Sequence, residues 1–168
     1  KKALKFSKIK NVIIEEYFSG TEFTIESFTI NYKTYILAVT KKYKVRGTNK
    51  TVAYKLESLK KESKLYIHLG KLIVRALSKL GYQNGPAHSE IIYNREKNKE
   101  IIVETSGRGG GFKIFDGLVP AVCGFDAVKA SILQSINKKI KIKKLLNNYA
   151  ILKWFPSKKR YCQKNYRF

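Results

Sequence analysis

Long apolar runs and methionine are what this sequence lacks most plainly. No run of about 18 apolar residues occurs, so no transmembrane helix is predicted, and the basic first ten residues lack the apolar core of a secretory signal. The chain contains no methionine and begins with lysine. We therefore expect it to be a fragment or a processed piece of a longer protein.

Cysteine is scarce as well, and this excludes two classes of site. Cys123 and Cys162 are far apart and show no CxxC spacing, which argues against a disulfide framework or a zinc site and predicts a reducing cytoplasm. Cys123 lies in an apolar stretch, residues 119–125, so we predict a small buried hydrophobic residue there and not a nucleophile.

Acidic residues are few: 12 stand against 35 basic residues, for a net charge of +23. Such a charge points to nucleic acid or an anionic membrane. The lysines are spread through almost every segment, however, and no known nucleic-acid-binding signature is present. We favour a solvated lysine-rich surface and expect neither a membrane nor nucleic acid as partner. A basic nucleic-acid-binding module remains the alternative, supported by the charge and by Trp154, Tyr161 and Tyr166.

Hydrophobic periodicity predicts an α+β domain, and 168 residues suit one domain. Apolar residues at steps of three and four over residues 60–80 predict the clearest helix, and Gly81 ends it. A second helix is predicted over residues 119–136, and residues 1–10 are read as the end of another. Strands are predicted over residues 11–17, 22–32, 34–43, 87–93, 100–105 and 148–155.

The strongest constellation is AHSEII at residues 87–92 followed by IIVETSGRGGG at residues 101–111. Side chains two residues apart share one face of a strand, so His88 lies with Glu90, and Glu104 lies with Ser106 and Arg108. Two carboxylates that face each other within a sheet repel, and a divalent cation such as Mg²⁺ removes that cost. A surface hairpin whose acids face water explains the spacing equally well.

The residues around this acid pair suit an anion. Arg108 offers a fixed fork of donors for a phosphate or carboxylate, and the glycines at residues 109–111 let backbone amides approach a bound anion. The glycine run alone is weak evidence, because it has neither the GK[ST] ending of a Walker loop nor the order of a dinucleotide fold. His88 is either a pocket residue or a hydrogen-bonded strand histidine.

A second constellation, VIIEEYFSGTE, covers residues 12–22. A hydrophobic strand leads into acids, and a tight turn leads to Glu22, where a carboxylate can accept hydrogen bonds from ribose hydroxyls. The backbone of residues 16–18 can face an adenine edge. An acidic hairpin beside lysine-rich neighbours is the alternative, and by itself the segment favours it.

Together the two constellations resemble the ATP-grasp superfamily over roughly residues 1–126. The AHSE and GRGGG words look most like carbamoyl-phosphate-synthetase-like and L-amino-acid-ligase-like members. The resemblance implies an α+β fold, the carboxyl-terminal lobe of ATP-grasp, as an antiparallel sheet with helices packed on one face. It assigns all of residues 1–168 to that part of the domain.

The same resemblance implies roles for individual residues. Glu90 and Glu104 match two Mg²⁺-bridging carboxylates, and Ser106 stands where the family commonly has an asparagine ligand. Arg108 matches an arginine that holds the substrate, and His88 lines its pocket. The nucleotide would be held by Glu15, Glu16, Tyr17, Phe18 and Glu22. Phosphates or substrate would be faced by one or more of Lys41, Lys42, Lys44 and Lys50.

The implied activity is an ATP-dependent ligase that activates a carboxylate as an acyl phosphate for attack by an amine or similar nucleophile. Its cofactors would be ATP and two Mg²⁺ ions, with Mn²⁺ as an alternative metal. The family's amino-terminal domains and phosphate loop would precede Lys1, so this piece alone would be inactive and would act with those domains or in a homo-oligomer. The alternative is a non-catalytic ATP-grasp remnant. The serine at position 106, where the family commonly has an asparagine ligand, is compatible with this alternative.

Overall fold

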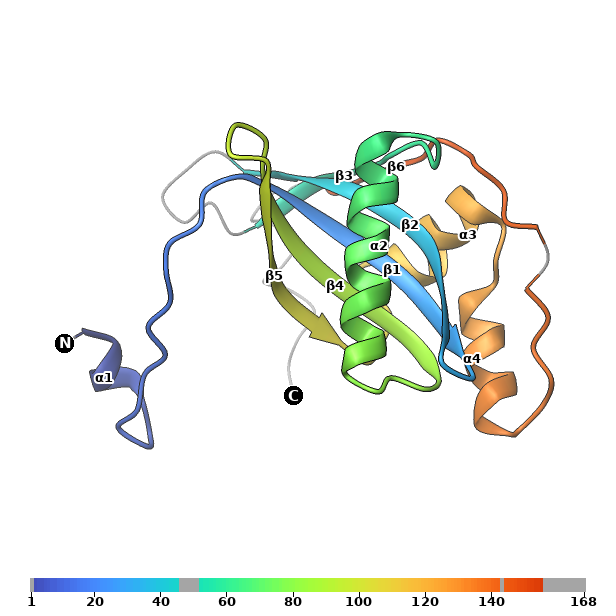
Figure 1. Cartoon of the computed structure of the whole chain (residues 1–168), viewed down its shortest axis with the longest axis horizontal. Coiled ribbons are helices and arrows are strands. Elements are labelled where there is room, and N and C mark those ends of the chain that lie inside the picture. The colour runs from blue at the N-terminus through green and yellow to red at the C-terminus, as the bar shows by residue number, and fades with distance from the viewer. Residues whose placement is uncertain (1, 46–51, 143, 156–168) are drawn as a thin grey trace, which may run out of the picture.

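Six strands form one antiparallel sheet in the computed structural model, which describes residues 2–45, 52–142 and 144–155 (Figure 1). The strand order is β5-β4-β1-β2-β3-β6. The strands are β1 (Thr21–Ile30), β2 (Lys33–Lys44), β3 (Ala53–Ser58), β4 (Gly85–Asn94), β5 (Lys99–Ser106) and β6 (Ile151–Lys153). The helices are α1 (Lys2–Phe6), α2 (Lys64–Lys79), the π-helical turn η1 (Ile114–Leu118), α3 (Val119–Cys123) and α4 (Ala127–Ser135). The predicted α+β fold is confirmed.

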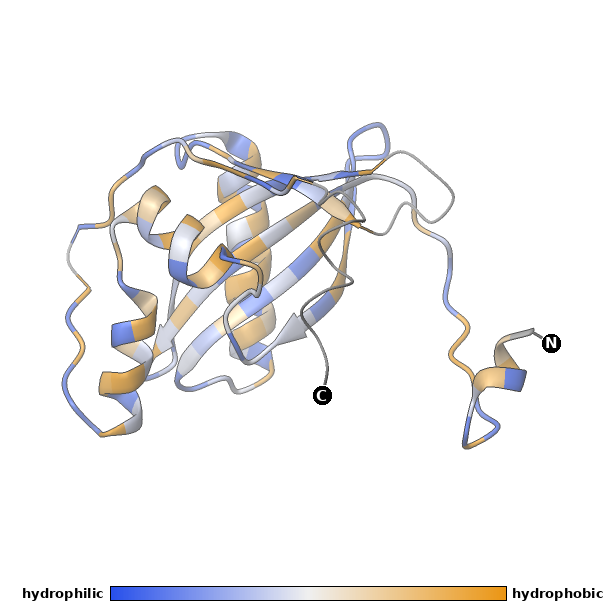
Figure 2. Ribbon diagram, turned by 180° about the vertical axis from the view of Figure 1, so that it is seen from behind, coloured by the Kyte–Doolittle hydropathy of each residue, from blue (hydrophilic) through white to orange (hydrophobic). Residues whose placement is uncertain are grey.

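Strand β1 shows why the sheet has two different faces. Phe23 and Ile25 point to one face and pack in the cluster under α2. Thr24 and Glu26 alternate with them and point to the opposite face, where both are buried. Helices cover both faces, since α2 lies on the first and η1, α3 and α4 lie on the second (Figure 2). We expected the helices to pack on one face of the sheet, but only α2 packs on its face and the other helices that cover the sheet pack on the opposite face.

Helix α2 lies within the predicted range 60–80 and begins four residues later. The side chain of Ser63 caps it by accepting a hydrogen bond from the backbone N–H of Tyr66 at 3.2 Å. Leu69, Ile73 and Leu77 form its buried face. Gly81 has a φ of 67°, the left-handed conformation that ends many helices.

The second predicted helix, residues 119–136, is divided in two. Gly124 has a φ of 68° and ends α3, and the carboxylate of Asp126 then caps α4 through the N–H of Lys129 at 2.8 Å. The glycine and the following cap residue are both sequence signals, and together they outweigh the apolar periodicity that runs across them.

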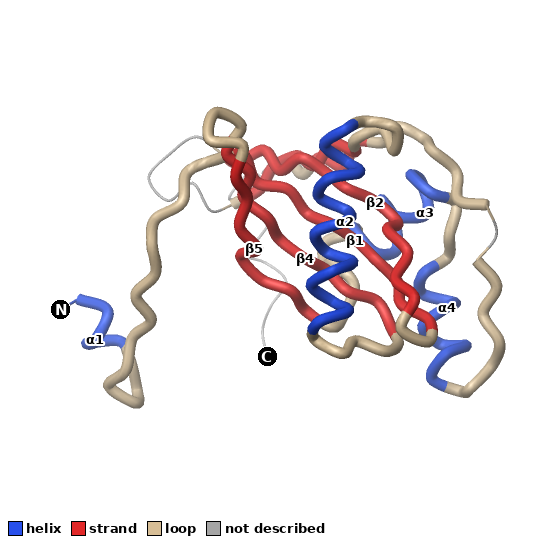
Figure 3. Tube along the Cα trace, viewed as in Figure 1, coloured by secondary structure: helices blue, strands red, loops and turns tan. Residues whose placement is uncertain are grey.

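The predicted strand over residues 11–17 is wrong. The chain there has no regular structure and runs from α1 toward the sheet (Figure 3). Ile13, Ile14 and Tyr17 are 88–90% exposed. Apolar, β-branched sequence favours extended backbone, but a strand also needs a hydrogen-bonding neighbour. No described strand pairs with this segment.

Strand β3 was not predicted, and it matters for the site. It pairs with β2 and with the short β6, in which Leu152 lies opposite Leu56. Within the described part of the chain, no helix is long and apolar enough to cross a membrane. Cys123 is buried as predicted, and burial raises the pKa of its thiol.

Candidate functional site

A cavity of about 710 Å³ opens on the sheet face opposite α2. We call it the central cavity. Its charged wall is formed by Lys42, His88, Glu90, Glu104 and Arg108. These side chains come from β2, β4, β5 and the glycine-rich loop that follows β5, so the sheet register brings together residues up to 66 positions apart, from 42 to 108.

Glu90 and Glu104 are direct cross-strand partners in the β4–β5 ladder. Side chains at such positions lie on the same face with Cβ atoms about 5 Å apart. Both line the central cavity. On the other side of Glu90, Thr24 of β1 is its partner, and it lines the cavity too. Two carboxylates thus face one space, as the spacing predicted.

Lys42 forms ion pairs with two acids on this face of the sheet. Its Nζ donates to Oε1 of Glu90 at 2.7 Å and lies 3.6 Å from Oε2 of Glu22. Lys44 also forms an ion pair with Glu22. Only 12% of the Lys42 side chain is exposed, so this contact is shielded from water more than a surface ion pair. Of Lys41, Lys42 and Lys44, the lysines considered from sequence that lie in the described part of the chain, only Lys42 lines the cavity.

A buried ion pair lies beneath the charged wall. Nδ1 of His88 contacts Oε1 of Glu26, and the two side chains are 7% and 1% exposed. The other Glu26 oxygen accepts a hydrogen bond from the backbone N–H of Gly110 at 3.0 Å. Glu26 therefore links the histidine on β4 to the glycine-rich loop.

The charges around His88 shift its own titration and that of Glu90. Burial alone lowers the pKa of His88, but contacts with the Glu26 and Glu90 carboxylates outweigh it and raise the pKa to about 9. His88 also lowers the pKa of Glu90 to about 2, with a further contribution from Lys42. His88 is consequently cationic and Glu90 anionic at neutral pH.

Close approach requires glycine at position 110. A Cβ there would lie 2.6 Å from Oε1 of Glu26 and 2.9 Å from Nδ1 of His88. At Gly111 a Cβ would meet nothing within 4 Å. The loop also carries Arg108, whose Nη1 donates to the carbonyl of Gly109 at 3.0 Å. The loop therefore packs directly against the buried ion pair, and its Arg108 lines the cavity.

The rest of the cavity wall is mostly apolar. It comes from β3, from the residues before it, from the end of the glycine-rich loop, and from the segment after β6. The residues are Val52, Ala53, Leu56, Phe112, Ile114 and Trp154.

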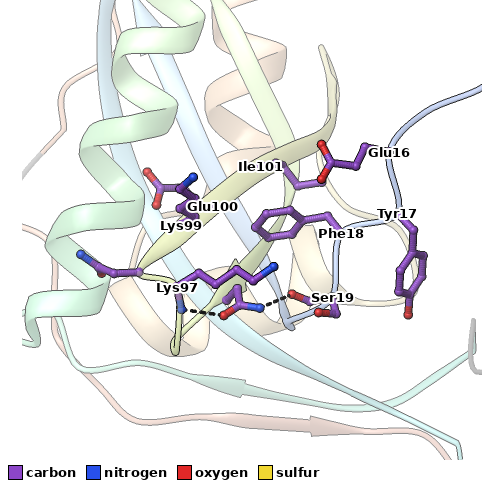
Figure 4. Close-up of a pocket in the computed structure, with 10 residues that line it drawn as sticks. Glu16, Tyr17, Phe18, Ser19, Lys97, Lys99, Glu100 and Ile101 are labelled. Carbon is purple, nitrogen blue, oxygen red and sulfur yellow. Dashed lines mark hydrogen bonds between the residues drawn. The ribbon is translucent and has the colours of Figure 1, made fainter.

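A second hollow, of about 410 Å³, lies where the segment before β1 meets the turn between β4 and β5 (Figure 4). Glu16, Tyr17 and Phe18 line it, as does Ser19, whose carbonyl accepts a hydrogen bond from Nδ2 of Asn94 at 2.9 Å. We call it the entry hollow. It includes three of the five residues predicted to bind the nucleotide.

Other predicted site residues lie apart from these walls. Ser106 is the register partner of His88 and is half-buried, but it does not line the central cavity. Glu15 is exposed and lies outside the entry hollow. Lys41 points to the other face, with Nζ 4.8 Å from the centre of the Tyr43 ring. Lys50, Cys162, Tyr161 and Tyr166 lie outside the described residues.

Sequence reasoning missed Glu26 and the apolar wall. The alternation Glu22, Thr24, Glu26 along β1 was available as a signal, because it places three polar side chains on one face. The wall formed by Leu56 and Trp154 was hidden because β3 was not predicted. Trp154 falls in the strand predicted over residues 148–155, and the sequence suggested a function for it only in nucleic-acid binding.

The carboxylate pair suits Mg²⁺ better than a transition metal. Within the described ranges, no group of three or more His, Cys, Asp or Glu is arranged to hold a metal ion. Mg²⁺ does not need such a cage, since it commonly takes one or two carboxylates and completes its shell with water and phosphate oxygens. Glu90 and Glu104 fit that description.

The family model of the ATP-grasp domain matches residues 2–116. The chain belongs to the ATP-grasp family. The match includes the entry hollow, the cross-strand acids and the glycine-rich loop, and it ends in η1. Comparison with curated protein sequences gives no match.

Solved ATP-grasp-like structures share the fold. Phosphoribosylglycinamide synthetase from Anaerococcus prevotii matches with a TM-score of 0.69 and 19% identity, covering 88% of this chain and 38% of that protein. L-amino acid ligase from Bacillus licheniformis matches at 0.63 and 21%, covering 71% and 30%. Biotin carboxylase from Campylobacter jejuni, in complex with β,γ-ATP, matches at 0.67 and 14%, covering 82% and 30%. This chain thus spans 30–38% of the length of these proteins.

Proposed function

We propose that this chain is the carboxyl-terminal part of an ATP-grasp ligase that uses ATP and Mg²⁺ to activate a carboxylate as an acyl phosphate, which an amine or similar nucleophile then attacks. The observation that supports this most is the cross-strand pair Glu90 and Glu104 in the central cavity, beside Lys42 and Arg108. The pair offers hard oxygen ligands, and the cations offer donors for phosphate or carboxylate oxygens.

Glu90 and Glu104 would hold the metal. When bound there, Mg²⁺ would neutralise phosphate charge and fix the phosphates for in-line transfer. Lys42 donates to Glu90 and would also donate to a phosphate oxygen bound in the cavity. Arg108 would bind the substrate carboxylate or the transferred phosphoryl group as a bidentate donor. No side chain has to act as a covalent nucleophile, because electrostatic stabilisation and positioning suffice for phosphoryl transfer.

The nucleoside would lie toward the entry hollow. The backbone of residues 16–18 would contact the adenine, and Glu22 would accept hydrogen bonds from ribose. Glu22 shares Lys42 with Glu90, so one lysine would connect the ribose end of the site with the metal end. The lobe that closes over the nucleotide would come from the rest of the enzyme.

The test is ADP formation by the enzyme that contains this chain, with Mg²⁺, a carboxylate and an amine. We expect Glu104→Gln to lower turnover by more than about a hundredfold while the circular dichroism spectrum is unchanged. Glu96→Gln, an exposed acid in the β4–β5 turn, is the matched control and should keep wild-type turnover. Normal Mg²⁺-dependent turnover in Glu104→Gln would refute the metal role, and no turnover in the wild type would favour a non-catalytic remnant.

Arg108→Ala separates substrate binding from nucleotide binding. We expect kcat to fall by at least about tenfold, since a fixed donor to the reacting group is lost, while the Kd for MgADP changes less than about threefold. Equal losses in both quantities would instead assign Arg108 to the nucleotide.

A nucleic-acid-binding role remains the second candidate because of the net charge of +23 and the cation–π contacts of Lys41 and Lys55 with Tyr43. Fluorescence anisotropy with single-stranded DNA over a range of salt distinguishes the two. Tight binding with a steep salt dependence, and no nucleotide binding, would favour this candidate.

A further inference from the structure

The two halves of the central cavity differ in chemistry. One half carries the charged side chains already described. The other half carries Leu56, Ile114, Phe112 and Trp154. It borders Lys42, the cross-strand partner of Leu56, whose ammonium group is already paired with Glu22 and Glu90. The two halves share one space, so a molecule bound at Arg108 extends along an apolar wall.

Four parts of the chain contribute to that wall. Leu56 on β3 and Ile114 in η1 are 1% and 7% exposed, so they form a fixed floor. Trp154 follows β6, where its backbone N–H donates to the carbonyl of Tyr54 at 2.9 Å. It lies two residues beyond Leu152, the partner of Leu56, and therefore on the same side of the sheet. Phe112 closes the wall from the glycine-rich loop and is 84% exposed.

From this arrangement we infer that the carboxylate substrate carries an aliphatic or aromatic side chain, which packs against Leu56, Phe112 and Trp154. The inference rests on the proposed function, because it places the carboxyl group beside Arg108. A charged side chain in the apolar half loses water, and the cation that borders this half, Lys42, is already paired with Glu22 and Glu90. An apolar side chain gains free energy from the same burial.

The size of the cavity agrees with this assignment. At about 710 Å³ it lies within the range of small-molecule sites, which is roughly 300–1,000 Å³. The planar adenine ring is the competing apolar occupant, and the test below separates it from the substrate.

Trp154 supplies the probe, because it is the single tryptophan of the sequence and lines the apolar half. The chain is titrated at constant ionic strength with acetate, butyrate and hexanoate, and with the dicarboxylates succinate and adipate. Butyrate and succinate have equal carbon chains, as do hexanoate and adipate. We expect saturable fluorescence changes whose Kd falls about fourfold for each buried methylene, and at least tenfold weaker binding of each dicarboxylate than of its partner.

Phe112→Ala tests the wall without disturbing the core. We expect it to weaken hexanoate binding about tenfold and acetate binding less than twofold. Tyr32→Ala is the matched control, since Tyr32 is also exposed and also has a positive φ, but lies in the β1–β2 turn outside the cavity. It should leave both Kd values unchanged.

The inference is overturned if succinate or adipate binds more tightly than its monocarboxylate partner, if Phe112→Ala has no effect on hexanoate, or if MgADP quenches Trp154 and competes with hexanoate. These titrations contain no ATP turnover. An active, Glu104-dependent ligase that prefers dicarboxylates would therefore refute the apolar substrate and leave the proposed function standing. An apolar preference without any ADP formation would do the opposite.

Discussion

The central cavity and the entry hollow are built in opposite ways. The first stands on buried residues of four paired strands, with Glu26 and His88 locked beneath it. One wall of the entry hollow is formed by residues 16–19, which belong to no strand. Among them, Tyr17 is 88% exposed. Substitutions in the first should therefore change the stability of the fold as well as binding. Substitutions in the second should change binding alone.

Glu26→Gln should give the largest loss of stability. It removes the negative charge from a buried pair and leaves His88 with only the longer 3.6 Å contact to Glu90, and breaking a buried pair typically costs about 3–5 kcal/mol. Urea unfolding at pH 7 measures the effect. A loss below about 1 kcal/mol would mean that the pair does not hold the cavity floor.

The pair of Glu26 and His88 should also determine how the stability of the fold depends on pH. The pKa of His88 is raised from 6.5 to about 9 in the folded protein. Its contribution is then fully present below pH 6.5 and is lost as pH rises through 9, amounting to about 3 kcal/mol. The unfolding free energy measured with urea should be higher at pH 6 than at pH 9.5 by that amount in wild type. The difference should be much smaller in Glu26→Gln. The exposed His68 provides the control, and His68→Gln should keep the wild-type difference.

At the acid end, Glu90 should act in the opposite sense. Its pKa is lowered to about 2 by His88 and Lys42, so its contribution is present above pH 4.5 and is lost as pH falls toward 2. Glu90→Gln should flatten unfolding free energy between pH 5 and pH 3 relative to wild type. An unchanged slope would contradict the contact with Lys42.

The glycine-rich loop offers a matched pair of substitutions. Gly110→Ala forces a Cβ against Glu26 and His88 and should destabilise the fold by about 2 kcal/mol. Gly111→Ala meets open space and should stay within about 0.5 kcal/mol of wild type. Thermal unfolding of the two variants side by side gives the comparison, and equal losses would show that the loop is not seated on Glu26.

The smallest effect on stability is expected in the entry hollow. Tyr17→Ala removes a side chain that is almost fully exposed, so the unfolding free energy should change by less than about 0.5 kcal/mol. MgADP binding by the enzyme, measured by calorimetry, should nevertheless weaken. A large loss of stability would show that residues 16–19 belong to the core after all.

Local sequence patterns predicted most of the sheet and the main helix, because their signals are periodic and short-ranged. The alternation along β1 and the three- and four-residue steps of α2 are examples. The acids Glu90 and Glu104 were found because both lie in apolar strands joined by a short turn. What failed depended on partners distant in sequence. Residues 11–17 have strand-like composition but no neighbour, and β3 becomes a strand through β2 and β6.

The same limit applied within the site. Glu26 and His88 are 62 positions apart, and only the β1–β4 register brings them together. Lys42 could not be chosen until the sheet register showed that it lies opposite Leu56 on the cavity face, whereas Lys41 lies opposite Phe23 on the other face. Family resemblance supplied roles for residues inside its motifs and named Lys42 only as one of four lysines, whereas Glu26 and Trp154 lie outside the motifs that carried it.

Lys42 has a consequence for how this protein reaches its folded state. An acidic metal site usually resists assembly until its cation arrives, because like charges are forced together. Here Lys42 lies between Glu90 and Glu22, and Lys44 and His88 supply further positive charge to Glu22 and Glu90 respectively. The strands can thus associate without a metal ion, and a Mg²⁺ ion bound at the proposed site would take the place of a cation that the fold already supplies.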